Sequence, residues 1–247
     1  MITVAFLETS LRIGGSEHVV TQLVRGLDRE RFRPFVCCLY EPGTLGEQLL
    51  KEGHAVYHSL AGNRADALLP FRLGRILKRE RADVLFIINQ AITQFWGTWA
   101  SLAAQVPVRI TAIRSTGKVN RIRRRLWINR FTFPWITRVT ALSETHKRYL
   151  VEKEGIDPRK MEIIANCVGL DRFTLGPKPQ PLMASLGLPT GVPIVGIVAM
   201  LRPEKGYPVF LEAARDVLNA VPETHFAIVG DGGERNRLEQ LASELGI

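Results

Sequence analysis

Two glycines near the amino terminus stand where a phosphate could bind. Gly14 and Gly15 follow an apolar run and open a segment with helical periodicity. Because glycine has no side chain, a ligand can approach the unpaired amides of a helix N-terminus, whose partial positive charge favours phosphate. A turn without any ligand is the alternative interpretation of the same residues.

A pair of cations marks a second loop. Arg202 and Lys205 stand three residues apart between a predicted strand and a predicted helix. An arginine fork and a lysine point charge so placed can both bind one pyrophosphate. The alternative is a solvated basic loop in which Glu204 forms a local ion pair.

A third glycine-rich turn, 230–234, again precedes a predicted helix. Gly230 and Asp231 are therefore candidates for a phosphate or acceptor site, and an N-terminal cap is the simpler role for Asp231.

The elements that must position these loops alternate between short apolar runs and helical periodicity, which is typical of a parallel α/β sheet. Strands are predicted at 2–8, 32–40, 55–60, 83–89, 108–113, 138–143, 162–166, 194–200 and 225–230. Apolar stripes spaced as on one helix face run from Val19 to Leu27 and through Ile92, Phe95, Trp96, Trp99 and Leu102, and we expect them to pack on the sheet. In such sheets ligands bind beyond the carboxyl ends of the strands, where the three loops lie.

The chain is expected to hold two domains. Residues 1–173 form a Rossmann-like domain, and the proline- and glycine-rich segment 174–193 is predicted to be a linker. Residues 194–247 then supply only two βα units, too few to cover both faces of a parallel sheet. We therefore expect a partial second domain in a chain that continues beyond it.

Charge is concentrated in one region. The net charge is +9, and residues 84–143 contain no Asp or Glu but nine basic residues, whereas the rest of the chain is balanced. The uncharged stretch 84–108 is long enough to span a bilayer, but its polar residues divide it into a strand and an amphipathic helix. The acid at Glu8 argues against a signal peptide, and the odd set of Cys37, Cys38 and Cys167 supports neither a disulfide framework nor a zinc site. The five histidines lack metal-ligand spacing, so no metal site is predicted.

Taken together, the loops resemble those of the family 4 glycosyltransferases, also called glycosyl transferase group 1, which have the GT-B fold of two facing Rossmann-like domains. The segments that carry the resemblance cover nearly the whole chain in the expected order: Gly14 to Glu17, Ala141 to Glu144, Ile163 to Asn166, Leu170 to Phe173, Arg202 to Gly206, and Ile228 to Gly232.

The resemblance implies a role for each loop. Gly14 and Gly15 would lie near the donor phosphates and the acceptor, and Arg202 and Lys205 would hold the donor diphosphate and stabilise it as the leaving group. Asn166, Gly230 and Asp231 would complete the phosphate and acceptor contacts. Fixed cations can oppose the developing negative charge without a metal ion, which fits the absence of a DxD motif. The family normally retains the anomeric configuration, and no cofactor beyond the nucleotide-diphosphate sugar is expected.

Three departures from the family pattern matter. Arg114 stands where members often carry a histidine that touches the sugar, so the donor sugar differs or an acidic group is recognised. The turn after Asn166 reads Cys167-Val168-Gly169 instead of Gly-Val-Asp. The chain ends before the glutamate pair that contacts donor sugar and ribose in the family.

Segment 119–138 interleaves arginines with aromatic residues. Arg123, Arg124, Arg125 and Trp127 are predicted to contact an anionic membrane surface. The alternatives are a helix whose aromatics pack on the sheet while its arginines are solvated, and a nucleic-acid patch, which no recognised module supports.

The sequence thus predicts a cytoplasmic hexosyltransferase-like enzyme, with peripheral attachment to the inner face of the cell membrane left open. It would move a sugar from a nucleotide-diphosphate donor to a hydroxyl of a lipid-linked or polysaccharide acceptor. A nucleotide-sugar epimerase of GT-B fold and a non-catalytic membrane- or nucleotide-binding fragment are the alternatives.

Overall fold

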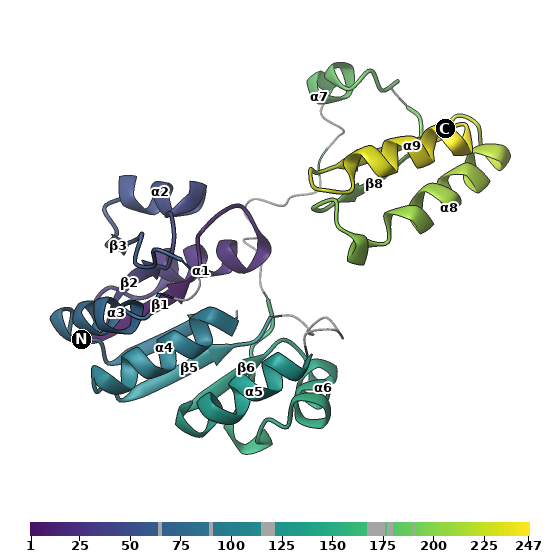
Figure 1. Cartoon of the computed structure of the whole chain (residues 1–247). Helices are drawn as coiled ribbons and strands as arrows, with labels where there is room; N and C mark the ends of the chain where they lie inside the picture. Colours follow the sequence, from purple (N-terminus) through teal and green to yellow (C-terminus); the bar gives the residue numbers. More distant parts are fainter. Residues whose placement is uncertain (64–65, 89–90, 115–121, 167–175, 177–179, 190) are drawn as a thin grey trace. The chain divides into compact units, whose positions relative to one another are not determined.

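A computed structural model of the chain (Figure 1) describes residues 1–63, 66–88, 91–114, 122–166, 176, 180–189 and 191–247. The chain divides into two compact units, Met1–Gly169 and Leu170–Ile247. Each unit is described separately below.

The first unit is built on a seven-stranded sheet in which every strand pair is parallel. Its strands in chain order are β1 (Ile2–Glu8), β2 (Phe32–Cys38), β3 (Val56–Tyr57), β4 (Val84–Ile88), β5 (Val108–Ala112), β6 (Arg138–Ala141) and β7 (Met161–Ile163). The spatial order is β3-β2-β1-β4-β5-β6-β7. The winding direction therefore reverses between β1 and β4, and at such a switch point the loops separate and leave a crevice for a ligand.

Helices cover both faces of this sheet. They are α1 (Gly15–Gly26), α2 (Gly43–Lys51), α3 (Leu69–Arg79), α4 (Ala91–Ala103), α5 (Ile122–Thr132) and α6 (Glu144–Glu154), with short 3-10 turns at η2 (Phe133–Trp135) and η3 (Pro158–Lys160). Alternate residues of β1 serve the two cores: Val4 and Phe6 pack with α1 and α2, and Ala5 and Leu7 pack with α3, α4 and α6. Burial on both faces explains why the strands read as continuous apolar runs, and each fully buried leucine contributes about 1.5–3 kcal/mol.

The helix α4 matches the sequence prediction only in part. Of the predicted stripe, Ile92 and Trp96 are half-buried and pack against the core, whereas Phe95 is half-buried and Trp99 is exposed. The fully buried positions of α4 carry small and polar residues: Thr93, Gln94, Gly97, Thr98, Ala100 and Ser101. Gly97 brings α4 against β1, since a Cβ at this position would collide with the Leu7 side chain. The uncharged stretch 84–108 is thus divided between β4, α4 and β5, and no helix among the described residues is long and apolar enough to cross a membrane.

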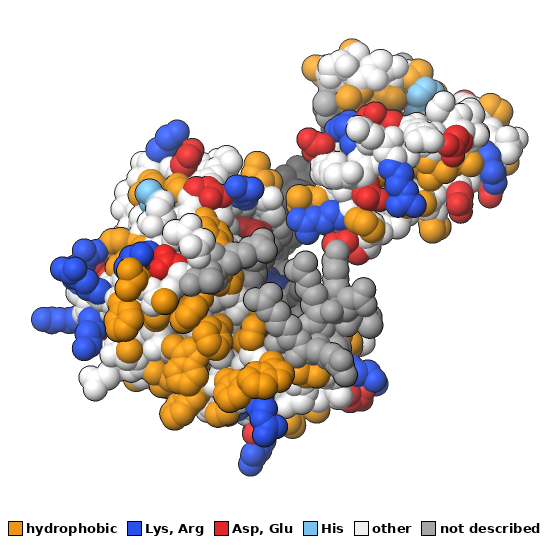
Figure 2. Space-filling model, in the orientation of Figure 1, with side chains coloured by type: hydrophobic (Ala, Val, Ile, Leu, Met, Phe, Trp, Pro, Cys, Tyr) orange, Lys and Arg blue, Asp and Glu red, His pale blue; other side chains and the backbone are white. Residues whose placement is uncertain are grey.

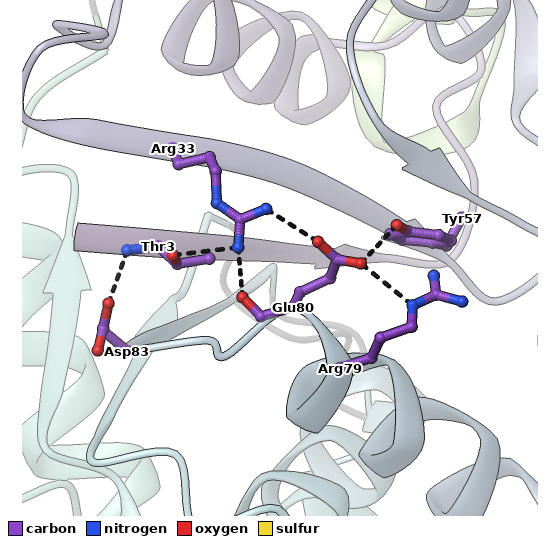
Figure 3. Close-up of polar contacts among 6 residues, drawn as sticks. All are labelled: Thr3, Arg33, Tyr57, Arg79, Glu80 and Asp83. Carbon is purple, nitrogen blue, oxygen red and sulfur yellow. Dashed lines mark hydrogen bonds and ion pairs between the residues drawn. The ribbon is translucent and has the colours of Figure 1, made fainter. Parts of the chain in front are cut away.

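A cluster of hydrogen-bonded polar side chains (Figure 3) connects neighbouring strands at the end of the sheet opposite the switch-point loops. Arg33, at the start of β2, donates to the Glu80 carboxylate at 2.9 Å and to the Thr3 hydroxyl at 3.3 Å. The Tyr57 hydroxyl donates to the other Glu80 oxygen at 2.8 Å, and Asp83 accepts from the Thr3 amide at 2.7 Å. The cluster links β1, β2 and β3 to the turn that enters β4.

The second unit has a two-stranded parallel sheet, β8 (Ile194–Val198) and β9 (His225–Val229). Its helices are α7 (Gln180–Ser185), α8 (Tyr207–Ala220) and α9 (Arg235–Leu245), with a 3-10 turn η5 (Pro203–Lys205). Leu201, Tyr207, Leu211 and Leu238 form its small buried core. The helix α7 lies inside 174–193, the segment predicted to be a linker, and most of 167–179 lies outside the described residues.

Candidate functional site

The loop that follows β1 lies at the switch point and is held rigidly at its base. Leu11 is fully buried, its amide donates to the Pro42 carbonyl at 3.1 Å, and its carbonyl accepts from the Leu45 amide at 2.9 Å. Gly43, with a φ of +67°, passes so close to Leu11 that a Cβ would collide with its backbone. The loops after β1 and β2 are therefore one packed unit that presents the start of α1.

Gly14 and Gly15 begin α1 as predicted, and they differ in their surroundings. A Cβ added at Gly15 would meet nothing within 4 Å, so the backbone here is open to a ligand. At Gly14 the Glu17 carboxylate lies against the Cα, and it also accepts a hydrogen bond from the Ser16 hydroxyl at 2.8 Å. The negative charge of Glu17 interacts favourably with the partial positive charge at the start of α1, and it competes with an incoming phosphate for the same position.

Two carboxylates therefore flank this loop, and their place was not predicted. Glu8 ends β1 with no exposed surface, and Glu17 closes over Gly14. Of the two, only Glu17 has exposed surface, and its carboxylate can accept hydrogen bonds from hydroxyls and repels anions. The sequence signal for Glu8 was its position as the one charged residue of the otherwise uncharged run 2–8.

Arg114 and Asn166 meet at the same edge of the sheet. Arg114 comes two residues after β5, Asn166 three residues after β7, and the guanidinium donates a hydrogen bond to the Asn166 side-chain oxygen. Between them, after β6, Ser143 caps α6 by accepting from the His146 amide at 3.1 Å. The two predicted site residues are thus brought together across the end of β6. Residues 115–121 and Cys167 to Gly169 lie outside the described residues.

In the second unit, Arg202 and Lys205 lie in the loop after β8, which turns into α8. Both are exposed, and none of the side-chain hydrogen bonds or ion pairs between described residues involves either one. Gly206, with a φ of +69°, makes the left-handed turn that both ends η5 and begins α8. The loop therefore holds two cations on one short turn at the carboxyl end of the sheet.

Gly230 and Asp231 follow β9 and have local structural roles. A Cβ at Gly230 would collide with the Ala199 carbonyl, and one at Gly232 would collide with the Leu201 carbonyl, so both glycines allow the loops after β8 and β9 to run side by side. Asp231 accepts from the Gly232 amide at 2.8 Å and from Arg235 at 3.2 Å, and these two partners lower its pKa. It does not cap α9, whose N-cap position is Glu234.

The residues predicted to touch a membrane lie in α5. The side chains of Arg123, Arg124 and Arg125 lie outside the described residues, and Trp127 is 68% exposed. Metal-ligand clusters of three or more His, Cys, Asp or Glu are absent from the parts of the chain that the structure describes.

The sheet order and the switch-point loop of the first unit, together with the two-stranded parallel sheet of the second, define a Rossmann-like α/β protein. The sequence profile of Glycosyltransferase Family 4 matches residues 13–172, and that of Glycosyl transferases group 1 matches residues 180–247. The chain therefore belongs to glycosyltransferase family 4.

Curated relatives agree with this assignment. The chain is 26% identical over 250 residues to UDP-Gal:alpha-D-GlcNAc-diphosphoundecaprenol alpha-1,3-galactosyltransferase of Escherichia coli, with 96% of this chain and 64% of that protein covered. It is 27% identical to lipopolysaccharide core biosynthesis glycosyltransferase LpsD of Rhizobium meliloti, with 95% and 61% covered. The chain thus spans less than two thirds of the length of these relatives.

Solved structures share the fold. Anabaena HepE in complex with UDP and glucose has a TM-score of 0.81 at 19% identity, covering 100% of this chain and 67% of that chain. A glycosyltransferase from Rickettsia africae has a TM-score of 0.75 at 20% identity, covering 99% and 65%. UDP-GlcNAc 2-epimerase from Neisseria meningitidis has a TM-score of 0.62 at 14% identity, covering 99% and 69%. These likenesses confirm the GT-B-type α/β fold predicted from the sequence.

Proposed function

We propose that the chain forms the acceptor domain and the first part of the donor domain of a glycosyltransferase. In this proposal the enzyme moves a sugar from a nucleotide-diphosphate donor to an acceptor hydroxyl. The family membership supports sugar transfer, and the E. coli and Rhizobium relatives, which are named for a diphosphoundecaprenol acceptor and for lipopolysaccharide core synthesis, support a lipid-linked or polysaccharide acceptor. Anabaena HepE, with its bound UDP, supports a uridine nucleotide as the first donor to test.

The observation that carries the proposal is the state of Arg202 and Lys205. Two exposed cations without an ion-pair partner among the described side chains lie on one turn after β8. When the bond between the sugar and the diphosphate breaks, its electron pair goes to the departing phosphate oxygen, and preorganised cations stabilise that charge. Retention of the anomeric configuration and independence of a metal ion are part of the proposal, as the family resemblance implies.

The acceptor would bind in the first unit. The loop after β1 offers open backbone at Gly15, and the neighbouring Gly14 is covered by the Glu17 carboxylate, which can accept a hydrogen bond from an acceptor hydroxyl. Arg114 and Asn166, farther along the same sheet edge, offer a guanidinium and an amide to an acidic group on the sugar or the acceptor.

Binding of UDP and of uridine to the 247-residue chain tests the donor half by calorimetry. We expect UDP to bind more tightly than uridine, and Arg202→Ala and Lys205→Ala each to weaken UDP roughly tenfold while leaving uridine unchanged, because a charged hydrogen bond contributes about 1.5–3 kcal/mol. Arg215→Ala is the matched control, since Arg215 is exposed in the same unit but is paired with Asp216 at 2.8 Å. Equal UDP affinity in all three variants would exclude the diphosphate assignment.

The epimerase alternative shares the fold, as the Neisseria enzyme shows, but not the matched family. Incubating a chain extended to the length of its relatives with UDP-sugars and a lipid-linked acceptor separates the two. A sugar-bearing acceptor supports transfer, whereas an epimerised donor without transfer supports the alternative.

A further inference from the structure

The helix α4 buries polar side chains and leaves large apolar ones on its outer side, unlike an ordinary surface helix. Its inward polar groups are satisfied within the protein: Thr93 donates to the Ile88 carbonyl at 2.6 Å, and Thr98 donates to the Gln94 carbonyl at 2.7 Å. The large side chains Phe95 and Trp99 lie on the outer side with their ring centroids 6.4 Å apart. An outer helix side in water normally carries the charged residues, and α4 has none.

The neighbouring helix α5 repeats the arrangement. Gln94, 1% exposed, donates to the Asn129 side chain at 3.2 Å and to the Thr132 hydroxyl at 2.7 Å, so α4 and α5 are joined by buried hydrogen bonds. On the outer side of α5, Trp127 and Phe131 are exposed and contact each other with ring centroids 4.9 Å apart. Polar residues thus hold the two helices together from inside while aromatic residues face outward.

The helix α3 extends this surface on the other side of α4. Phe71 is 74% exposed, and it lines a shallow hollow of about 280 Å³ together with Ala103 at the end of α4. Figure 2 shows hydrophobic side chains gathered over the part of the first unit where Figure 1 places α4 and α5. We call the surface formed by Phe71, Phe95, Trp99, Trp127 and Phe131 the α3–α5 face.

Cations border this face, and no acid of α4 or α5 opposes them. Arg75 and Lys78 line the hollow beside Phe71, and Arg130 lines a larger hollow of about 570 Å³ beside Trp127. None of the ion pairs between described residues involves Arg75, Lys78 or Arg130. Glu154 and Asp157 also line the larger hollow, but Glu154 is buried and bonded to Asn129, and Asp157 is paired with Arg159 at 2.9 Å.

We infer that the α3–α5 face docks on an anionic lipid surface. Aromatic side chains enter the boundary between headgroups and acyl chains, and lysine and arginine at its margin bind lipid phosphates. A protein partner would need a matching apolar surface with acidic margins, whereas a bilayer supplies both over any area. The inference rests on the surface alone and does not depend on the proposed function, so either can fail without the other.

Two of the four tryptophans of the chain, Trp99 and Trp127, belong to this face, and the other two, Trp96 and Trp135, lie in α4 and η2, so a change in fluorescence on docking reports on this face. The 247-residue chain is titrated with vesicles of brominated phosphatidylcholine alone and with vesicles that also contain phosphatidylglycerol, so that both carry the quencher. We expect quenching and flotation with the anionic vesicles only, and binding that weakens steeply with salt. Equal binding to both vesicles, or none to either, overturns the inference.

Variants then locate the contact. Phe71→Ser combined with Trp127→Ser is expected to weaken vesicle binding at least tenfold, and Arg75→Gln and Lys78→Gln about fivefold each. The matched control is Ile13→Ser with Leu50→Ser, which changes two exposed apolar side chains away from this face. Undiminished binding by the face variants overturns the inference, as does a dimer that buries the tryptophans in the absence of lipid. If a variant fails to fold, the comparison of vesicle compositions with the parent chain decides.

The alternative to a lipid surface is that a segment of a longer chain covers the α3–α5 face. The same titration with a chain extended to the length of its relatives tests it. Loss of vesicle binding in the longer chain would assign the face to the added residues and overturn the inference.

Discussion

Arg114 and Asn166, 52 residues apart in sequence, are joined by a side-chain hydrogen bond across the end of β6. The bond fixes a guanidinium at the carboxyl edge of the sheet, where ligands of parallel α/β proteins bind. In a chain extended to the length of its relatives, we expect Arg114→Ala to lower kcat/KM roughly ten- to a hundredfold, the effect of one hydrogen bond to a charged group.

Arg114→Lys is expected to restore only part of the activity, because an ammonium lacks the planar fork of arginine. Asn166→Ala removes a positioning contact and should lower kcat/KM several-fold. Initial-rate measurements with each variant test both statements. An Arg114→Ala enzyme with the parent kcat/KM would contradict a role for this pair in the site.

Glu80 is expected to make stability depend on pH. Burial alone would raise its pKa, but hydrogen bonds from Arg33, Tyr57 and Arg79 outweigh burial and lower it (Figure 3). A carboxyl whose pKa is lowered on folding stabilises the protein above its unfolded pKa of about 4.5, and this stabilisation is lost as the pH falls through the folded pKa.

Glu80→Gln should therefore reduce the free energy of unfolding at neutral pH by about 1–3 kcal/mol. The difference from the parent chain should shrink as the pH is lowered below about 4.5. Urea unfolding between pH 7 and pH 3 measures it, with Glu162→Gln, an exposed acid 3.9 Å from Arg138, as the control. A difference that is constant over this range would show that the charge of Glu80 is not responsible.

Cys37 and Cys38 are expected to be unreactive in the folded chain. Both lie buried in β2; burial and the neighbouring thiol raise the pKa of Cys37, and burial and Glu8 raise the pKa of Cys38 to about 12. The thiolate is the reactive form, so it is absent at neutral pH. A Cys167→Ser chain, in which these two are the remaining cysteines, should yield no reactive thiol when native and two when denatured. Rapid labelling of the native chain would contradict this.

Gly230 and Gly232 are expected to be required for the fold of the second unit. Alanine at either position would press a Cβ into the Ala199 or the Leu201 carbonyl, so we expect each substitution to destabilise the unit by roughly 1–3 kcal/mol. Gly233→Ala is the matched control, because a Cβ there meets nothing within 4 Å. Hydrogen exchange of the β8 and β9 amides measures the effect. Similar exchange in all three variants would refute the packing argument.

The positions of the strands could be predicted because a buried parallel strand is a continuous apolar run between turn residues. Predicted strands at 2–8, 108–113 and 194–200 correspond to β1, β5 and β8 within two residues at each end. The orientation of α4 could not be predicted in the same way. Gln94, Thr98 and Ser101 have the same helical spacing as the aromatic residues, so periodicity identifies two sides of the helix without stating which one meets the sheet.

The candidate site was predictable in part for a similar reason. A loop cation such as Arg202 is exposed because nothing packs over a short strand-to-helix turn, and its position follows from the strand that precedes it. The contact of Glu17 with Gly14 depends on a side-chain rotamer, and the bond between Arg114 and Asn166 depends on the distance between β5 and β7. The spacing of residues along the sequence specifies neither the Glu17 rotamer nor the distance between β5 and β7.

The central place of β1 in the sheet has a consequence for how the chain is made. During synthesis β1 emerges before both of its neighbours, and it pairs on one side with β2, which ends at Cys38, and on the other with β4, which ends at Ile88. One edge of β1 therefore stays unpaired until the chain has grown from Cys38 to Ile88, more than twice the length needed for the first pairing. The sheet is complete only when β7 has been made, at Ile163. Nascent chains halted between β2 and β4 should accordingly be the ones that trigger-type chaperones hold most firmly.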